Sequence, residues 1–376
     1  MRRHELDWLR VIVFGLLIFY HVGMFFVPWD YHIKNNTIYH WLTYPMWFLN
    51  QWRLPILFII SGMGTFYALR KRTGKQFAWE RLKRLSIPLI VGMIFIVPPQ
   101  VYVERLVNAQ FTGHYFDFWP VHALRGSYPV GNFSWHHLWF LPYLLLFSLF
   151  LIPLFLYFKN HPNNGFNSWL KPLVKSPLGI YVFIIPLYFI EAFIEPFFPV
   201  THALIDDWFT IINCITLFTY GFLIIAVNDT FWLTVEKYRG YFLVAGIMSF
   251  TIMLFLTHKY EESHTRHLTA AFFKVLNLWS WILAIFGFAA KYLNTESKAL
   301  SYSNEAVYPF YILHQSVMLV IAYYLIDLDW SLGSKAGIMV LGTFGISWLF
   351  YECLIRRWKC IRPLFGLKKK ALKGNN

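Results

Sequence analysis

The sequence predicts an all-α, polytopic membrane protein, a bundle of about ten transmembrane helices. Of its 376 residues, 57% are hydrophobic and 21% aromatic, whereas only 14% are charged, and the mean hydropathy is +0.47. These values lie well outside the usual range of soluble globular domains. Apolar segments long enough to cross a bilayer as helices recur along the whole chain, with only short loops between them.

These apolar segments set the expected element order. The predicted transmembrane helices lie near residues 9–27, 45–69, 85–103, 138–157, 177–198, 209–227, 240–257, 270–291, 305–326 and 336–355. We assign residues 1–355 to a single transmembrane domain and residues 356–376 to a basic cytoplasmic tail. The first segment begins like a signal peptide, but it contains Asp7 and Arg10 and no small-residue cleavage site follows it. It is therefore predicted to be an uncleaved first span.

The formal net charge of +14 arises from 33 Lys and Arg residues against 19 Asp and Glu residues. In a soluble chain such an excess would suggest an anionic partner such as nucleic acid. Here the basic runs RKRTGKQFAWERLKR and RRWKCIRPLFGLKKKALKGNN each follow an apolar span directly. This placement obeys the positive-inside rule, so both termini are predicted to be cytoplasmic. We expect a multi-pass protein embedded in a lipid bilayer, with no nucleic-acid partner.

Most of the 14 histidines lie in the predicted outer loops, among them His32, His136 and His137. No histidine spacing with a nearby carboxylate is typical of a metal site, and the three cysteines form no metal or redox pair, so no metal is predicted. The longest outer loop, residues 104–137, mixes aromatic residues with glycine and proline. Such a loop suits either a sugar-binding platform or an aromatic belt at the membrane interface.

Arg10 and His21 are ionisable residues on the otherwise apolar first span. Eleven helical steps return to within about 20° of the same face and advance about 16 Å along the axis. A charge in the membrane costs at least about 2.5 kcal/mol, so such residues usually face a protein interior or a wet cavity. An imidazole can take a proton from a hydroxyl, and Asp7 can pair with Arg10. A snorkelling arginine and an interhelical hydrogen bond are the structural alternatives.

Arginines stand at both ends of the predicted bundle. Arg53 follows an outer loop and must point into the bundle or back to the interface, and Pro55 frees backbone groups beside it. Arg81, Lys83 and Arg84 lie in a cytoplasmic segment, where the two arginines share a helical face. Two guanidinium groups suit a phosphate or pyrophosphate, although a positive-inside cluster has the same composition.

The last two spans also carry ionisable residues. The segment NEAVYPFYILHQS places Tyr311 and His314 on one helical face, and Glu352 lies in the final span. Intramembrane ionisable residues face the bundle interior by default, although helix–helix hydrogen bonds could explain each one. Elsewhere, the small residues of SGMG at 61–64 are expected to let two helices approach closely.

In their order along the chain, these motifs resemble the membrane acyltransferase family 3. They are LDWLR with His21 following Arg10 after a gap of ten residues, RLPILFIISG, RLKR followed by IP, HLWFLPYLL, and VYPFYILH. The resemblance covers nearly the whole chain. The tail RRWKCIRPLFGLK and the region around RLPILFIISG are similar to the glucan succinyltransferase branch of the family.

The resemblance implies transfer of an acetyl or succinyl group from cytoplasmic acyl-CoA to a hydroxyl of a glycan or similar acceptor. The transfer would end at the outer face of a bacterial inner membrane, and no bound cofactor is expected. Arg10 and His21 match the family's essential pair, and Arg81 and Arg84 match an Arg-x-x-Arg motif of the donor side.

The match is weaker near the C-terminus. Glu352 stands close to the family's late carboxylate, but Cys353 replaces the proline that usually follows. No hydrolase-like domain follows the last span, so transfer is expected to finish in the membrane domain or to use a separate partner. Oligomeric state is not readable from the sequence.

On this hypothesis, the phosphates of acyl-CoA contact Lys83 and the neighbouring arginines from the cytoplasm. His21 acts as general base on the acceptor or carries the acyl group, Arg10 positions the donor, and Arg53 stabilises the oxyanion. Direct and two-step transfer both fit the sequence.

Two other classes of protein stay open at this stage. A transporter or channel would use the same residues to line a path, namely Arg10, His21, Arg53, His314 and Glu352. No pair of matched broken helices marks two repeated halves, which argues against this class. An inactive scaffold in envelope-polysaccharide synthesis is the third interpretation.

Overall fold

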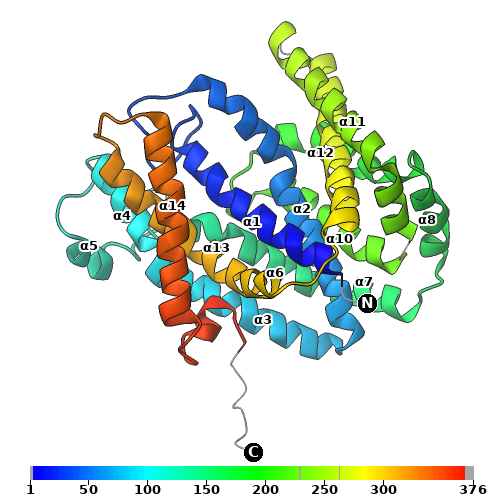
Figure 1. Ribbon diagram of the computed structural model, residues 1–376, viewed down its shortest axis with the longest axis horizontal. Coiled ribbons are helices and arrows are strands. Elements are labelled where there is room, and N and C mark those ends of the chain that lie inside the picture. The colour runs from blue at the N-terminus through cyan, green and yellow to red at the C-terminus, as the bar shows by residue number, and fades with distance from the viewer. Residues whose placement is uncertain (1–2, 228–229, 262, 369–376) are drawn as a thin grey trace, which may run out of the picture. The chain divides into compact units, whose positions relative to one another are not determined.

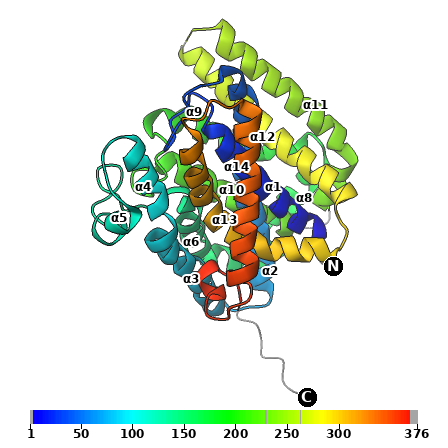
Figure 2. The same cartoon turned by 60° about the vertical axis from the view of Figure 1, so that its left-hand side comes forward.

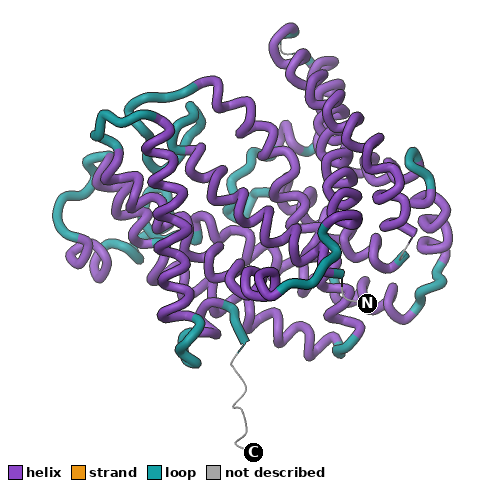
Figure 3. The backbone as a smooth tube through the Cα atoms, in the orientation of Figure 1, coloured by secondary structure: helices purple, strands orange, loops and turns teal. Residues whose placement is uncertain are grey.

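The computed structural model describes residues 3–227, 230–261 and 263–368, whose course is shown in Figure 1. Every extended regular element in these ranges is a helix, as the tube in Figure 3 also shows. Within the same ranges an isolated bridge joins Ser127 to Phe133 in the loop between α5 and α6. The all-α prediction is therefore confirmed for this part of the chain.

Nine helical segments of the described residues are long and apolar enough to cross a membrane, and a bent pair raises the number to ten. The bent pair joins His136–Phe150 to Ile152–Asn160 at an angle of 50°. This agrees with the predicted number of spans, and the protein is a multi-pass integral membrane protein. The other candidate spans are His4–Met24, His40–Arg70, Gly74–Val107, Gly179–Phe197, Trp208–Ala226, Thr230–Lys259, His264–Tyr292, Lys298–Leu325 and Leu332–Ile355.

Several helices extend beyond their apolar part. The helix predicted at 240–257, for example, begins at residue 230, because hydropathy marks only the apolar section of a helix that continues into water. The α-helices are α1 (His4–Met24), α2 (Thr43–Arg70), α3 (Gly74–Val91), α4 (Pro98–Val107), α5 (Tyr115–Val121), α6 (Phe140–Phe150), α7 (Ile152–Asn160), α8 (Gly165–Lys175), α9 (Ile184–Phe193), α10 (Trp208–Ala226), α11 (Thr230–Lys259), α12 (His264–Tyr292), α13 (Lys298–Leu325) and α14 (Leu332–Phe350).

The third span, predicted as one helix over 85–103, is broken by a π-helical turn at Gly92–Ile96, after which α4 begins at Pro98. Because Pro98 has no backbone N–H, the carbonyl oxygen of Ile94 loses its usual helical partner. The indole N–H of Trp119 donates to that oxygen instead, at 2.9 Å. A break in a membrane helix is tolerated where the protein supplies such partners.

The chain divides into two compact units. Unit 1 comprises Met1–Arg10, Trp47–Trp79 and Leu146–Ser297. Unit 2 comprises Val11–Met46, Glu80–Leu145 and Lys298–Asn376. Four helices, α1, α2, α3 and α6, contribute residues to both units.

In unit 1, α2 and α10 approach each other at two glycines. A Cβ at Gly62 would lie 1.9 Å from the carbonyl oxygen of Phe218, and one at Gly221 would lie 1.9 Å from that of Ile59. No side chain fits at either position, so the close approach of the two backbones requires glycine. The close helix approach expected from SGMG is therefore confirmed. Gly62 is the residue that permits it, because a Cβ at Gly64 would meet nothing within 4 Å.

We expect Gly62→Ala to lower the thermal unfolding midpoint of the detergent-solubilised protein. The added methyl group must push α2 away from α10, at a cost of about 1–3 kcal/mol. Gly64→Ala, two residues further along the same helix, is the matched control and should leave the midpoint unchanged. Equal midpoints for the two variants would contradict this account of the helix crossing.

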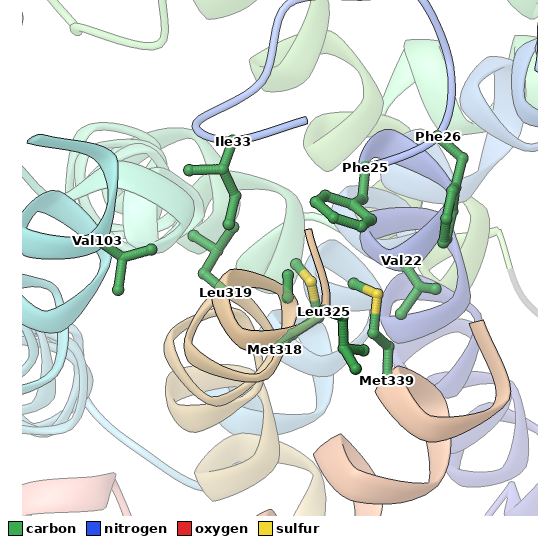
Figure 4. Close-up of a cluster of buried hydrophobic side chains, with 10 residues drawn as sticks. Val22, Phe25, Phe26, Ile33, Val103, Met318, Leu319, Leu325 and Met339 are labelled. Atoms are coloured by element: carbon green, nitrogen blue, oxygen red, sulfur yellow. The ribbon is translucent and has the colours of Figure 1, made fainter. Parts of the chain in front are cut away.

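Unit 2 is built around α13, which packs on α4 and runs beside α14 (Figure 2). Towards its C-terminal end, α13 joins a buried apolar cluster that also draws on α1, the loop after α1, α4 and α14 (Figure 4). Shared burial therefore holds these elements together at one end of the unit. The members of the cluster are Val22, Phe25, Phe26, Ile33, Val103, Met318, Leu319, Ala322, Leu325 and Met339.

Two lysines fix the loop that follows α1. Lys34 donates hydrogen bonds to the carbonyl oxygens of Met24 (2.6 Å) and Trp29 (2.8 Å), which closes the C-terminal end of the helix. Desolvation by burial lowers the pKa of Lys34 to about 8. Lys335, buried at the start of α14, donates to Asn35 at 2.7 Å. The loop therefore has a defined position relative to α1 and α14.

The C-terminal segment at 356–368 is folded against α13. The buried guanidinium of Arg362 donates to Glu305 at 2.8 Å. Gly366, at φ 71°, packs so closely on the ring of Tyr308 that a Cβ would lie 2.0 Å from a ring carbon. Residues 369–376, the rest of the predicted basic tail, lie outside the described residues.

Candidate active site

His21 of α1 and His314 of α13 lie next to each other inside unit 2, with ring centroids 5.0 Å apart. His314 is buried, with 1% of its surface exposed, and His21 is half-buried. The sequence marks both residues as candidates but contains nothing that pairs them, because almost 300 positions separate them. Their pairing is a product of the packing of α1 on α13.

A cavity of about 270 Å³ is lined at one end by His314, beside which His21 lies. It lies between α1, α13 and α14 and extends along α13 from Tyr302 to His314, about 18 Å by helical rise. On the predicted orientation, Tyr302 marks its cytoplasmic end. The lining is mostly apolar and consists of Val11, Phe14, Gly15, Ile18, Tyr302, Ser303, Ala306, Val307, Phe310, Tyr311, His314, Phe344 and Trp348.

The ring of His314 is held in one orientation by the backbone. Its Nδ1 lies 2.7 Å from the carbonyl oxygen of Tyr311. A carbonyl oxygen only accepts hydrogen bonds, so Nδ1 carries the proton and Nε2 of the neutral ring carries the lone pair. An imidazole in this tautomer can accept a proton at Nε2 without rotating.

His137 packs edge-on against His314, at 5.2 Å between ring centroids, and both of its nitrogens are bonded. Nε2 donates to the carbonyl oxygen of Ile312 (3.0 Å), and Nδ1 accepts from the amide of Gln100 (3.1 Å). The same amide donates to Ser316 at 2.7 Å. This network makes His137 a neutral support for His314. Sequence reasoning missed His137, because it counted this residue among the histidines of an outer loop.

Tyr311 is a positioning residue by its contacts. Its hydroxyl donates to the carbonyl oxygen of His137 at 2.7 Å, and Phe14 packs edge-on against its ring at 5.5 Å. The hydroxyl is therefore engaged with the backbone, while the ring forms part of the cavity wall. The prediction that Tyr311 and His314 share a helical face agrees with their common place in the cavity lining.

His21 has a second neighbour in Tyr31, which comes from the loop after α1. The hydroxyl of Tyr31 lies 3.4 Å from Nδ1 of His21. The rings meet edge-on, with centroids 6.1 Å apart. Tyr31 was not among the predicted site residues, because a tyrosine in the loop, ten positions beyond His21, carries no signal of its own.

Glu352 stands at the far end of the cavity from His314. Arg356 donates to both of its carboxylate oxygens, at 2.9 and 3.0 Å, and Tyr302 donates to one of them at 3.0 Å. Trp348 in turn donates to the hydroxyl of Tyr302 at 2.9 Å. The late carboxylate thus orients two residues of the cavity lining, Tyr302 and Trp348.

The basic motif of Arg81, Lys83 and Arg84 meets α13 at Tyr308, whose hydroxyl donates to the carbonyl oxygen of Arg84 at 3.1 Å. Arg84 and Lys83 are exposed and Arg81 is half-buried. Because Gly366 packs on the other side of the same tyrosine, the C-terminal basic segment lies close to this motif. Its exposed cations add to those of the motif.

The remaining predicted residues belong to unit 1. Arg10 donates to Asp7 at 3.1 Å, which is the pairing expected from their spacing. Arg53 is 2% exposed, so its side chain is buried and does not point back to the interface. Arg10 and His21 both lie on α1, a single uninterrupted helix. Among the described residues, no cluster of three or more His, Cys, Asp or Glu side chains is arranged to hold a metal ion.

Comparison with protein families identifies the class. Residues 3–352 match the model of the acyltransferase family 3, described as an acyltransferase domain, and the chain belongs to this family. Family membership identifies an acyltransferase, and not the transporter that the buried charges alone left open.

The chain is also similar to individual curated proteins. Glucans biosynthesis protein C from Escherichia coli and from Shigella dysenteriae is 23% identical to it over 367 residues. The matches cover 94% of this chain and 92% of each relative. No solved structure matches the chain.

We expect Tyr311→Phe to lower mainly the stability of the protein, and His314→Asn to lower mainly its rate of acyl transfer. Tyr311→Phe removes one hydrogen bond and should cost about 1 kcal/mol of stability, with acyl transfer within a few-fold of wild type. His314→Asn keeps an N–H donor for the Tyr311 carbonyl but lacks Nε2. Its transfer rate should fall at least about 100-fold, the usual contribution of a proton-transfer group. Radiolabelled acyl transfer and thermal unfolding measure both effects, and equal rates for the two variants would refute the distinction.

Proposed function

We propose that the protein transfers an acetyl or succinyl group from cytoplasmic acyl-CoA to a hydroxyl of a glycan or similar acceptor at the outer face of a bacterial inner membrane. The observation that carries the proposal is the apolar cavity of unit 2, which ends at His314 with His21 beside it. An apolar cavity that leads to a proton-accepting pair suits a thioester arm that must react away from water.

The donor's phosphates would bind outside the cavity. Arg81, Lys83 and Arg84 supply guanidinium and ammonium groups at the cytoplasmic end of the predicted topology. The bond from Tyr308 to Arg84 ties this motif to α13, the helix that lines the cavity. A phosphate group bound at the motif and a thioester near His314 would thus both be positioned relative to α13.

The chemistry would take place at the histidine pair. His21 would take the acceptor's proton as general base or carry the acyl group for one step. His314, with its lone pair at Nε2, would pass protons between His21 and the leaving thiolate in the cavity. Arg10, paired with Asp7 on the same helix as His21, would position the donor.

The choice of a glycan acceptor is supported by the relatives. The proteins that match nearly the full chain bear the name glucans biosynthesis protein C. We therefore propose a glucose polymer as the acceptor and a succinyl group as one candidate donor group.

The test is acyl transfer by purified protein in nanodiscs, with radiolabelled acetyl- or succinyl-CoA and glucose oligosaccharides. His21→Ala should abolish transfer but keep acyl-CoA affinity, whereas Arg81→Ala should weaken acyl-CoA binding about tenfold. Lys75→Ala, an exposed cation on the same helix α3, is the matched control. Unchanged transfer by the His21 variant would disprove the mechanism, and failure of the wild type to bind acyl-CoA would disprove the donor.

A second test addresses the cavity. Gly15 lines it, and a Cβ at this position would meet nothing within 4 Å, so Gly15→Leu should fold and fill the space with a side chain. We expect the KM for acyl-CoA to rise at least about tenfold, because the thioester arm loses its room. Gly337→Leu on α14 also meets no neighbour within 4 Å but lies outside the lining, so it serves as control. An unchanged KM in Gly15→Leu would show that the donor does not use this cavity.

A further inference from the structure

A second polar cluster lies in unit 2, at the end of α4. His32, from the loop after α1, places Nδ1 2.5 Å from a carboxylate oxygen of Glu104. His136 packs edge-on against both His32 and Tyr128, with centroid distances of 4.7 and 4.6 Å. These four residues come from three separate segments of the chain. The proposed mechanism uses none of them.

Core packing fixes the two ends of this cluster. Ile33 and Val103, the sequence neighbours of His32 and Glu104, belong to the buried apolar cluster of unit 2 (Figure 4). Glu104 itself is 5% exposed. Tyr128 also hydrogen-bonds to Glu104, and burial raises the pKa of this phenol to about 12, so it remains a donor. Glu104 thus orients two side chains at once.

Arg105 holds the loop that carries Tyr128. Its guanidinium donates to the carbonyl oxygens of Pro129 and Gly131, each at 2.7 Å, and to the side chain of Asn132 at 2.9 Å. It also lies over the ring of Tyr128, at 5.7 Å from the centroid. Arg105 of α4 therefore fixes the position of the loop that carries Tyr128.

Two imidazole nitrogens of the cluster make no hydrogen bond within the part of the chain that the structure describes. Because Glu104 binds Nδ1 of His32, the Nε2 atom of that ring faces away from the carboxylate as an acceptor. Nε2 of His136 is buried and has no protein partner. The backbone of His136 also has φ 39°, in the left-handed region that non-glycine residues rarely adopt.

These features do not improve the stability of the fold. An unpaired buried nitrogen costs about 1–3 kcal/mol, and a left-handed non-glycine residue costs a similar amount. Strain and unpaired polar atoms of this kind cluster at binding sites, where a ligand supplies the missing bonds. The His32 side chain is 14% exposed, which gives such a ligand access.

The cluster adjoins the candidate active site through Tyr31. This residue precedes His32 in the sequence, its ring lies 5.2 Å from that of His32, and its hydroxyl contacts His21. A ligand at His32 would therefore lie within a few side chains of the reacting group.

We propose that His32, Glu104, Tyr128 and His136 form the acceptor subsite and bind a neutral saccharide through neighbouring hydroxyl groups. One hydroxyl donates to Nε2 of His32, and another pairs with Nε2 of His136, while Tyr128 offers an aromatic wall. The carboxylate of Glu104 disfavours an anionic ligand and positions His32. The inference rests on the proposed function and specifies where its acceptor binds.

The variant His32→Asn tests the proposed contact between Nε2 of His32 and a saccharide hydroxyl. An asparagine amide can still donate to Glu104, but it lacks the second ring nitrogen. Acyl transfer to a glucose tetrasaccharide is measured in nanodiscs, together with calorimetric binding of the tetrasaccharide and of acyl-CoA. We expect the acceptor KM and Kd to rise about tenfold, with kcat and acyl-CoA affinity within twofold of wild type. Glu104→Gln, which keeps an acceptor for His32, should raise the acceptor KM less than Glu104→Ala.

The control is His40→Ala, an exposed histidine of the same unit that has no contact with the cluster. A fall in kcat with an unchanged acceptor KM would overturn the proposal in favour of a proton relay to His21. An unchanged acceptor Kd in His32→Asn and Glu104→Ala, both folded by their unfolding midpoints, would also overturn it. Absence of acyl-CoA binding in the wild type would instead refute the proposed donor and leave the acceptor test intact, since saccharide binding is measured without acyl-CoA.

Discussion

Polar groups inside a bilayer find no water, and unit 2 satisfies this constraint with hydrogen bonds centred on α13. The hydroxyl of Ser316 donates at 2.5 Å to the carbonyl oxygen of Ile96, at the break between α3 and α4. Gln315 donates to Gln100 at 3.1 Å, and Gln100 in turn binds Ser316 and His137. The broken third span and the polar face of α13 therefore depend on each other. A different register of α13 would leave both without partners.

The candidate active site inherits its geometry from this network. His137 is held neutral between Gln100 and the Ile312 carbonyl, and the ring of His314 rests against it. The Tyr311 carbonyl then selects the tautomer of His314, whose ring lies beside that of His21. In an apolar cavity such preorganised groups interact more strongly than in water. A fixed hydrogen-bond network next to the apolar cavity is a suitable arrangement for acyl transfer.

The spans were predictable because the bilayer imposes a one-dimensional rule of length and hydropathy on each of them. The same rule could not reveal the break at Gly92–Ile96, since these five residues are all apolar and the carbonyl oxygens of Ile94 and Ile96 are satisfied by distant Trp119 and Ser316. It also misled the assignment of His137, which begins a bent span and is 6% exposed. At the edge of a span, hydropathy counts a histidine as polar and assigns it to the loop, whereas its burial depends on partners elsewhere in the chain.

The sequence by itself determined the all-helical membrane architecture, the family motifs and the local pairing of Arg10 with Asp7, because each of these depends on composition or on near neighbours. Only the tertiary structure decided that His21 meets His314 and that His32 meets Glu104. Dozens to hundreds of residues separate the members of each pair, and helix packing alone brings them into contact. The cavity beside His314 likewise exists only because α1 packs with space between it and α13 and α14, which lie at the other end of the chain.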